Sequence, residues 1–262
     1  MPRLQKTFER TRAAKRPALV GYLTAGDPDF VGSLDIIDAA CSAGLDILEI
    51  GIPFSDPTAD GPVIQRASSR AIKAGMNLEK GISYVQSLRQ KHPQLPIIIF
   101  SYYNPIFAMG TDRFVKTASD AGADGVLVVD LPGECSDEIT RHVKQGSFHF
   151  IRLVSPTTAP KRREEILKNA DGFVYVVSRH GVTGSGGNSI NWNALQQEIT
   201  EMKMITEIPL CVGFGISTPE DVKNVANIAD GVVVGSAFQR LVEDEPKTAK
   251  GTVAELVRKL RG

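Results

Sequence analysis

Short runs of apolar and β-branched residues recur along the whole chain at fairly even spacing. Most are apolar on both faces, which is typical of parallel strands covered on each side by helices. We expect strands at residues 18–24, 47–52, 96–101, 125–129, 148–154, 172–177, 210–213 and 231–234.

Segments with helical periodicity lie between these runs, and Gly or Pro marks most of the joints. Strand–helix alternation repeated eight times predicts an α/β fold of the (β/α)8 TIM barrel type, although a doubly wound open sheet would give a similar local pattern. No composition break divides the chain, so residues 1–262 are expected to form a single domain. We expect helices at residues 31–43, 62–74, 78–91, 112–121, 219–228 and 252–260.

The first sixteen residues are basic, and Leu4, Phe8 and Thr11 share one helical face. This pattern predicts an extra N-terminal helix that closes the barrel floor. A transit peptide is the alternative interpretation; a secretory signal would need an apolar core that the segment lacks.

Composition narrows the class of protein. The 262 residues carry 30 Lys and Arg against 30 Asp and Glu, so no global field favours nucleic acid or a membrane surface. No apolar run approaches the ~18 residues of a membrane span. The cysteines Cys41, Cys135 and Cys211 lie in or beside apolar stretches without CxxC spacing, which indicates reduced, packed thiols and a cytoplasmic location.

Candidate catalytic residues follow the strands, because α/β folds place their sites at the carboxyl ends of parallel strands. Glu49 lies inside an otherwise apolar strand, where burial would raise its pKa toward the range useful for proton transfer. The alternative is a Glu satisfied by backbone donors or an Arg. Asp60 follows in a proline-rich loop, residues 53–62, that could hold it over a ligand. Taken alone, however, Asp60 is better explained as a helix N-cap.

Glycines near the last two expected strands predict a phosphate site. Gly213, Gly215 and Gly235 would let backbone amides approach an anion, and a short helix beginning near Ser236 would direct its positive end there. Glycines that serve only as tight turns are the alternative. Tyr175 lies within the sixth strand, and the Gly-rich stretch after it is expected to act as a lid, unless it is simply a loop.

Other chemistries have little support. The four histidines show no zinc-binding spacing, so we expect no metal site. No GxSxG motif is present, no Lys lies within an expected strand for a Schiff base, and no GxGxxG motif follows the first strand.

The segment from Leu48 to Pro62 closely resembles the signature of the tryptophan synthase α chain family, with supporting matches from Leu19 to Ala237. The resemblance implies lyase activity: retro-aldol cleavage of indole-3-glycerol phosphate to indole and glyceraldehyde 3-phosphate. It implies that Glu49 is the general acid/base, that Asp60 holds the indole N–H, and that Tyr175 lies near the glycerol chain. It also implies substrate contacts from Tyr22, Phe100, Leu127, Val129, Leu153, Thr183, Gly184, Phe214, Gly215, Val233, Gly235 and Ser236.

The same resemblance implies a partner, the β subunit, in an α2β2 heterotetramer. Pyridoxal phosphate (PLP) would belong to that subunit, and this chain would need no cofactor. Residues 53–62 and 104–109 are the expected contact surface. Thr58, where Leu is frequent, and His180, where a small residue is common, depart from the family pattern and put lid closure and signalling from the β subunit in doubt.

Three functions stay open at this point: the partnered lyase, a stand-alone indole-releasing lyase, and a phosphate-binding activator without catalysis. The intact pair Glu49 and Asp60 argues against the last. An isomerase barrel that uses the same phosphate loops is a weaker fourth.

Overall fold

The strands form a closed barrel in sequence order, with β8 paired to β1 and every neighbouring pair parallel. The computed structural model describes residues 1–143, 148–178, 190–213 and 215–262. Eight parallel strands closed on themselves confirm the TIM barrel and exclude the open sheet. The strands are β1 (Ala18–Thr24), β2 (Ile47–Gly51), β3 (Ile97–Ser101), β4 (Gly125–Val128), β5 (His149–Val154), β6 (Val174–Val177), β7 (Leu210–Gly213) and β8 (Gly231–Val234).

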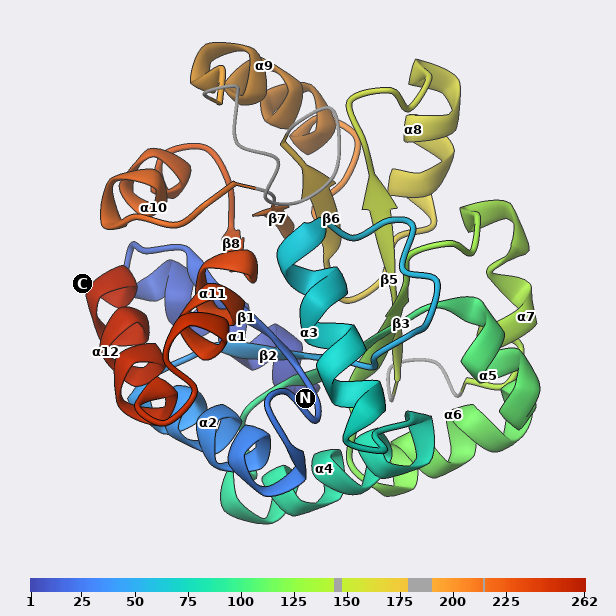
Figure 1. Ribbon diagram of the computed structural model, residues 1–262. Coiled ribbons are helices and arrows are strands. Elements are labelled where there is room, and N and C mark those ends of the chain that lie inside the picture. The colour runs from blue at the N-terminus through green and yellow to red at the C-terminus, as the bar shows by residue number, and fades with distance from the viewer. Residues whose placement is uncertain (144–147, 179–189, 214) are drawn as a thin grey trace.

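Helices surround the barrel as an outer layer (Figure 1). Those expected from the sequence are α1 (Arg3–Ala13), α2 (Phe30–Ala43), α3 (Pro62–Lys73), α4 (Leu78–Lys91), α6 (Thr111–Asp120), α10 (Pro219–Ala226), α11 (Ser236–Asp244) and α12 (Ala249–Arg261). Those not expected are α5 (Tyr103–Met109), η1 (Gly133–Cys135), α7 (Asp137–Thr140), α8 (Pro160–Lys168) and α9 (Trp192–Lys203).

Periodicity missed helices that are short or weakly amphipathic. Helix α8 buries only Ile166 and Leu167 in a run of charged residues, so its apolar stripe is too narrow to recognise. Residues 104–109, part of the expected contact surface and not expected to be helical, lie within helix α5, which buries only Ile106. Seven residues span about two turns, too few for a helical period to show.

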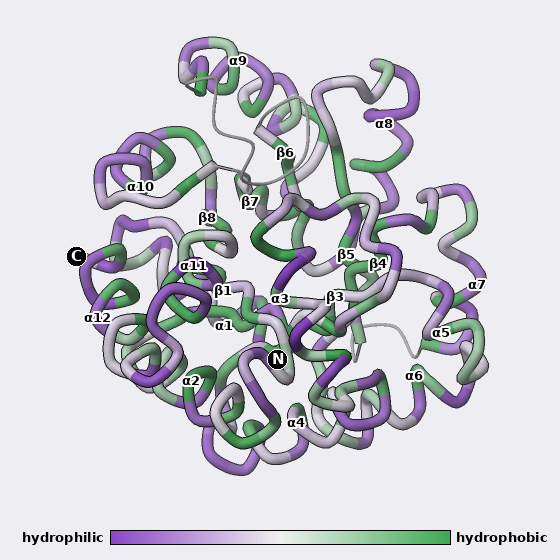
Figure 2. The backbone as a smooth tube through the Cα atoms, in the orientation of Figure 1, coloured by the Kyte–Doolittle hydropathy of each residue, from purple (hydrophilic) through white to green (hydrophobic). Residues whose placement is uncertain are grey.

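Apolar side chains form one core outside the barrel and a second inside it. The outer core lies between strands and helices, and the green strands at the centre of Figure 2 contrast with purple outer helical faces. The inner core takes alternate strand residues, including Val20, Ile47, Ile98 and Leu127. Because side chains alternate across a strand, Glu49 on β2 points to the same interior as Ile47.

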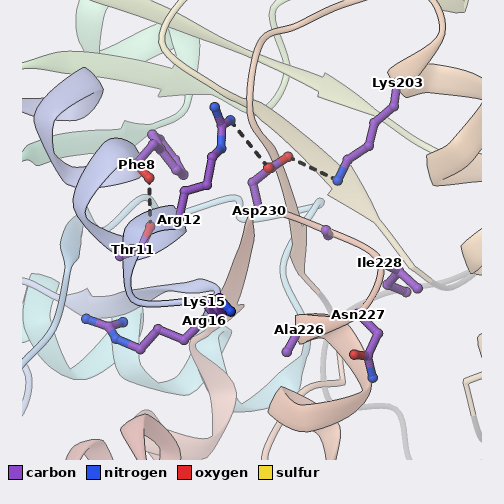
Figure 3. Close-up of a pocket in the computed structure, with 11 residues that line it drawn as sticks. Phe8, Thr11, Arg12, Lys15, Arg16, Lys203, Ala226, Asn227, Ile228 and Asp230 are labelled. Atoms are coloured by element: carbon purple, nitrogen blue, oxygen red, sulfur yellow. Dashed lines mark hydrogen bonds and ion pairs between the residues drawn. The ribbon is translucent and has the colours of Figure 1, made fainter.

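Helix α1 closes the amino-terminal end of the barrel, as expected. Leu4 and Phe8 join the inner core, where the Phe8 ring lies 6.1 Å from that of Phe173. Basic side chains then pair with aspartates that precede strands. Asp230, just before β8, lies 3.8 Å from Arg12 and 3.5 Å from Lys203 (Figure 3).

Two further aspartates repeat this arrangement. Asp46, before β2, accepts from Arg10 and Arg16, and Asp124, before β4, accepts from Arg3 and Arg89. The floor is therefore packed and ion-paired, which leaves the carboxyl ends of the strands as the open end for chemistry.

The cysteines are all free thiols, but they differ in burial. Cys41 and Cys211 are buried as expected, whereas Cys135 is exposed, so the prediction of a packed thiol is wrong there. The reason is that the short helix η1 buries none of its residues. No helix in the described part of the chain is long and apolar enough to cross a membrane.

Candidate active site

Glu49 occupies the middle of strand β2 and is fully buried inside the barrel. Neither of its carboxyl oxygens has a hydrogen-bond partner among the described residues. Removal from water disfavours the charged form, and this burial raises the pKa of Glu49 to about 8. The alternative of a structural Glu held by backbone donors or an Arg therefore has no support in the described part of the chain.

Asp60 lies in the loop between β2 and α3 and is buried, with 7% of its surface exposed. The Tyr102 hydroxyl donates to Asp60 Oδ2 at 3.0 Å, while the Ala59 amide donates to the same hydroxyl at 3.0 Å. Burial raises the pKa of Asp60 to about 6, and the hydrogen bond from Tyr102 opposes that rise. Gly61 is the N-cap of α3, without a side-chain cap, so the N-cap interpretation of Asp60 is wrong.

Tyr102 is a site residue that the sequence pattern did not single out. It follows the last residue of β3, beyond the apolar run, and its ring stacks on Phe54 at 5.0 Å with 27° between planes. The stack and the two hydrogen bonds fix residues 53–62 against the end of β3. An aromatic residue immediately after a barrel strand was the available signal.

Two buried tyrosines share the interior with the carboxylates. Tyr22 is 7% and Tyr175 6% exposed. Burial raises the pKa of both phenols well above the usual value, and the charges of Glu49 and Asp60 raise it further. Both hydroxyls are therefore neutral at any working pH and lie within electrostatic reach of both carboxylates.

Apolar side chains surround the carboxyl groups inside the barrel. The expected wall residues Phe100, Leu127, Val129, Leu153 and Val233 all belong to the inner core, together with Tyr175. Apolar side chains around a few polar groups suit a flat bicyclic ring.

The expected phosphate residues lie at the carboxyl ends of β7 and β8. Gly215 has φ +87°, so the tight-turn interpretation holds for this residue as well. Gly235 is the N-cap of α11, and Ser236 is the first residue of that helix. The α11 N-terminus thus offers backbone amides that have no partner within the helix, and the positive end of the helix dipole, at the top of the barrel.

A partly buried ion-pair network, also missed from the sequence, connects α11 to α3. Asp27 is 2% exposed and receives two hydrogen bonds from Arg70, at 2.7 and 2.8 Å. Gln239 of α11 donates to Asp27 at 3.1 Å, and Glu243 accepts from Arg70 at 2.8 Å. The helix that bears Ser236 is therefore fixed relative to the helix that follows Asp60.

Some expected site residues lie outside the described part of the chain. These are Thr183 and Gly184, the rest of the expected lid with His180, and Phe214. Within the described ranges, no group of three or more His, Cys, Asp or Glu side chains could hold a metal ion.

Comparisons with known proteins agree with this site. Residues 8–261 match the family described as tryptophan synthase alpha chain. The chain is similar to the tryptophan synthase alpha chain of Desulfatibacillum aliphaticivorans, with 53% identity over 92% of this chain and 90% of that protein. The corresponding protein of Desulfosudis oleivorans is 50% identical over 100% of this chain and 98% of its own.

Solved structures agree as well. The crystal structure of tryptophan synthase subunit alpha from Legionella pneumophila superimposes with a TM-score of 0.89 at 35% identity, covering 100% of this chain and 97% of that one. The fold, the two buried carboxyl groups and these similarities all support one family assignment. The chain belongs to the tryptophan synthase alpha chain family, the lyase subunits that cleave indole-3-glycerol phosphate in tryptophan biosynthesis.

Proposed function

We propose that Glu49 is the general acid/base with which this chain cleaves indole-3-glycerol phosphate to indole and glyceraldehyde 3-phosphate. The observation that carries the proposal is its full burial with no hydrogen-bond partner among the described residues. A carboxyl group whose pKa burial raises to about 8 holds its proton at neutral pH and can donate it.

The proton balance needs only one such group. Glu49 donates its proton to C3 of the indole ring, which makes the ring an electron acceptor. The resulting carboxylate removes the proton from the C1' hydroxyl; the C3–C1' bond then breaks, its electron pair returns to the ring, and C1' becomes the aldehyde carbon. Glu49 ends protonated, as it began, and no metal or imine is required.

We assign to Asp60 the task of holding the indole N–H. Positive charge develops on the ring when C3 is protonated, so an ionised carboxylate beside the ring nitrogen stabilises the transition state. The hydroxyl of Tyr102 occupies Asp60 Oδ2, and within the described ranges no donor meets the other oxygen, which we assign to the ring nitrogen. Tyr102 thereby acts as a positioning residue.

The remaining substrate contacts follow the shape of the molecule. Phe100, Leu127 and Val233 would contact the ring, and Tyr175 would lie near the glycerol chain. The amides at Gly235 and Ser236 would bind the phosphate at the α11 N-terminus. For Thr183, Gly184, Phe214 and Gly215, the assignment rests on the family resemblance.

A β subunit is the partner that family membership implies, and PLP belongs to that subunit. We propose an α2β2 complex in which residues 53–62 and 104–109 contact it. Phe107 of α5 supports this surface, because 66% of its side chain is exposed beside the carboxyl end of β3. Aromatic residues, Phe among them, are enriched at the cores of protein–protein interfaces.

Alanine or serine variants of this surface test the contact. Pro57→Ala, Asn104→Ala and Phe107→Ser should each weaken activation by the β subunit more than they change the basal turnover of the isolated chain. The matched control is Met204→Ser, since Met204 is 78% exposed at the end of α9. Unchanged activation in all three variants would remove these segments from the interface.

The activity itself is tested by indole release from indole-3-glycerol phosphate, with and without the β subunit. Strong activation by the partner supports the partnered lyase, and high turnover alone would favour the stand-alone lyase. No indole under either condition would contradict the proposal. The single domain of residues 1–262 and the cytoplasmic location both stay predictions.

A further inference from the structure

Tyr22 on β1 and Tyr175 on β6 are placed in the same way relative to the strand that follows each of them. A Cβ atom added at Gly51 of β2 would lie 2.3 Å from the Tyr22 hydroxyl oxygen. A Cβ atom added at Gly213 of β7 would lie 2.2 Å from the Tyr175 hydroxyl oxygen. Neither glycine has a positive φ, so each is present for space, and each phenol occupies that space.

The Tyr22 ring is fixed between the phosphate end of the site and the carboxylates. A Cβ atom added at Gly235, the N-cap of α11, would lie 3.2 Å from Tyr22 Cβ. The ring packs edge-on against Phe100, with centroids 5.0 Å apart and 77° between planes. On the other side, Tyr22 is paired in register with Glu49. A substrate that reached from α11 to Glu49 would pass the Tyr22 hydroxyl with its three-carbon chain.

The Tyr22 hydroxyl and the Glu49 carboxyl group could form more hydrogen bonds than the described residues provide. The Tyr22 hydroxyl accepts from Thr24 Oγ1 at 3.4 Å, and within the described part of the chain no acceptor takes its own hydrogen. Both Glu49 oxygens likewise lack a partner there. Buried polar groups normally find partners, so a phenol hydrogen and a carboxyl group that lack them indicate a polar ligand group between them.

We propose that the Tyr22 hydroxyl donates a hydrogen bond to a glycerol hydroxyl of the substrate and holds the three-carbon chain beside Glu49. This goes beyond the role of an indole-pocket wall, which needs only the ring, and it rests on the proposed function of Glu49. With Tyr175 it makes a pair of phenols that flank the bond to be broken. The substrate's hydroxyls would then supply the partners that Tyr22 and Glu49 lack.

The test compares two ligands that differ only in these hydroxyls. Tyr22→Phe keeps the ring and removes the donor. We expect kcat/KM for indole-3-glycerol phosphate to fall about tenfold, the effect of one uncharged hydrogen bond. The inhibition constant of indole-3-propanol phosphate, in which both glycerol hydroxyls are replaced by hydrogen, should change less than twofold. An unchanged kcat/KM, or an equal loss for both ligands, would overturn the proposal.

Two further variants keep the interpretation unambiguous. Tyr84→Phe also removes a buried hydroxyl, one bonded to Ser33 on the outer side of the barrel, and should leave both constants unchanged. Glu49→Gln, measured in the same assay, tests the proposed function separately. If that variant kept wild-type turnover, the role of Glu49 would fail whatever Tyr22→Phe showed.

Discussion

Glu49→Gln is expected to stabilise the fold while it removes catalysis. In the unfolded chain the carboxyl ionises near its ordinary pKa of 4.5, whereas in the folded barrel burial raises the pKa to about 8. A raised carboxyl pKa means that the unfolded state releases its proton first, so folding stability falls as pH rises from 4.5 and stops falling above 8. Glutamine has nearly the same shape and cannot ionise, so it avoids this loss.

The magnitude follows from the two pKa values. At 1.36 kcal/mol per pKa unit, Glu49 lowers stability by about 1 kcal/mol at pH 5 and about 4 kcal/mol at pH 8. Because the side chain is fully buried, solvent does not screen the effect. Glu49→Gln should therefore exceed the wild-type chain in free energy of unfolding by amounts that grow across this range.

Urea unfolding followed by circular dichroism at pH 5 and pH 8 measures the difference. The control is Glu207→Gln, which removes one negative charge from an exposed loop and should show no such growth. A free-energy difference between wild type and Glu49→Gln that is the same at both pH values would refute the reasoning, because Glu49 would then ionise alike in the folded and unfolded states.

Three further predictions concern the site and its support. The kcat/KM profile should be bell-shaped, rising near pH 6 as Asp60 ionises and falling near pH 8 as Glu49 loses its proton. Tyr102→Phe should raise the pKa of Asp60 and move the acid limb upward by about one unit, since the hydroxyl's hydrogen bond favours the carboxylate. Arg70→Met should lower the free energy of unfolding by about 3 kcal/mol, because Asp27 stays buried without its cation; urea unfolding measures it. A flat pH profile would contradict the first prediction, and an acid limb that does not move in Tyr102→Phe would contradict the second. For Arg70→Met, a loss in free energy of unfolding under ~1 kcal/mol, the scale of an exposed ion pair, would contradict the third.

Arg66 provides a matched control for Arg70→Met. Arg66 also pairs with Glu243, at 2.7 Å, but its side chain is 54% exposed. Arg66→Met should therefore lower the free energy of unfolding by less than Arg70→Met does, because exposed ion pairs contribute little.

The barrel could be predicted from the sequence because parallel strands under helices are apolar on both faces. That pattern located all eight strands to within two residues and placed Glu49 as a buried carboxyl inside one of them. The burial of Leu4, Phe8 and Thr11 likewise followed from their helical spacing. In each case residues close together in the sequence determine the secondary structure and which side chains are buried.

The features that were missed depend on contacts between distant segments. Tyr102 meets Asp60 from 42 residues away, and Gln239 meets Asp27 from 212 residues away. No periodicity records such pairs. The N-cap interpretation of Asp60 failed for the same reason, because only the closed barrel directs that carboxylate toward Tyr102. The exposure of Cys135 depended on how little the helix η1 buries.

Proton delivery from Glu49 to C3 of indole can be observed without cleavage. In D2O, a chain that binds indole should exchange the C3 hydrogen for deuterium, and proton NMR follows the loss of that signal. We predict exchange by the wild-type chain and by Tyr84→Phe, and a decrease of at least ~100-fold in Glu49→Gln, the scale of lost acid/base catalysis. Exchange by Glu49→Gln at the wild-type rate would contradict the account.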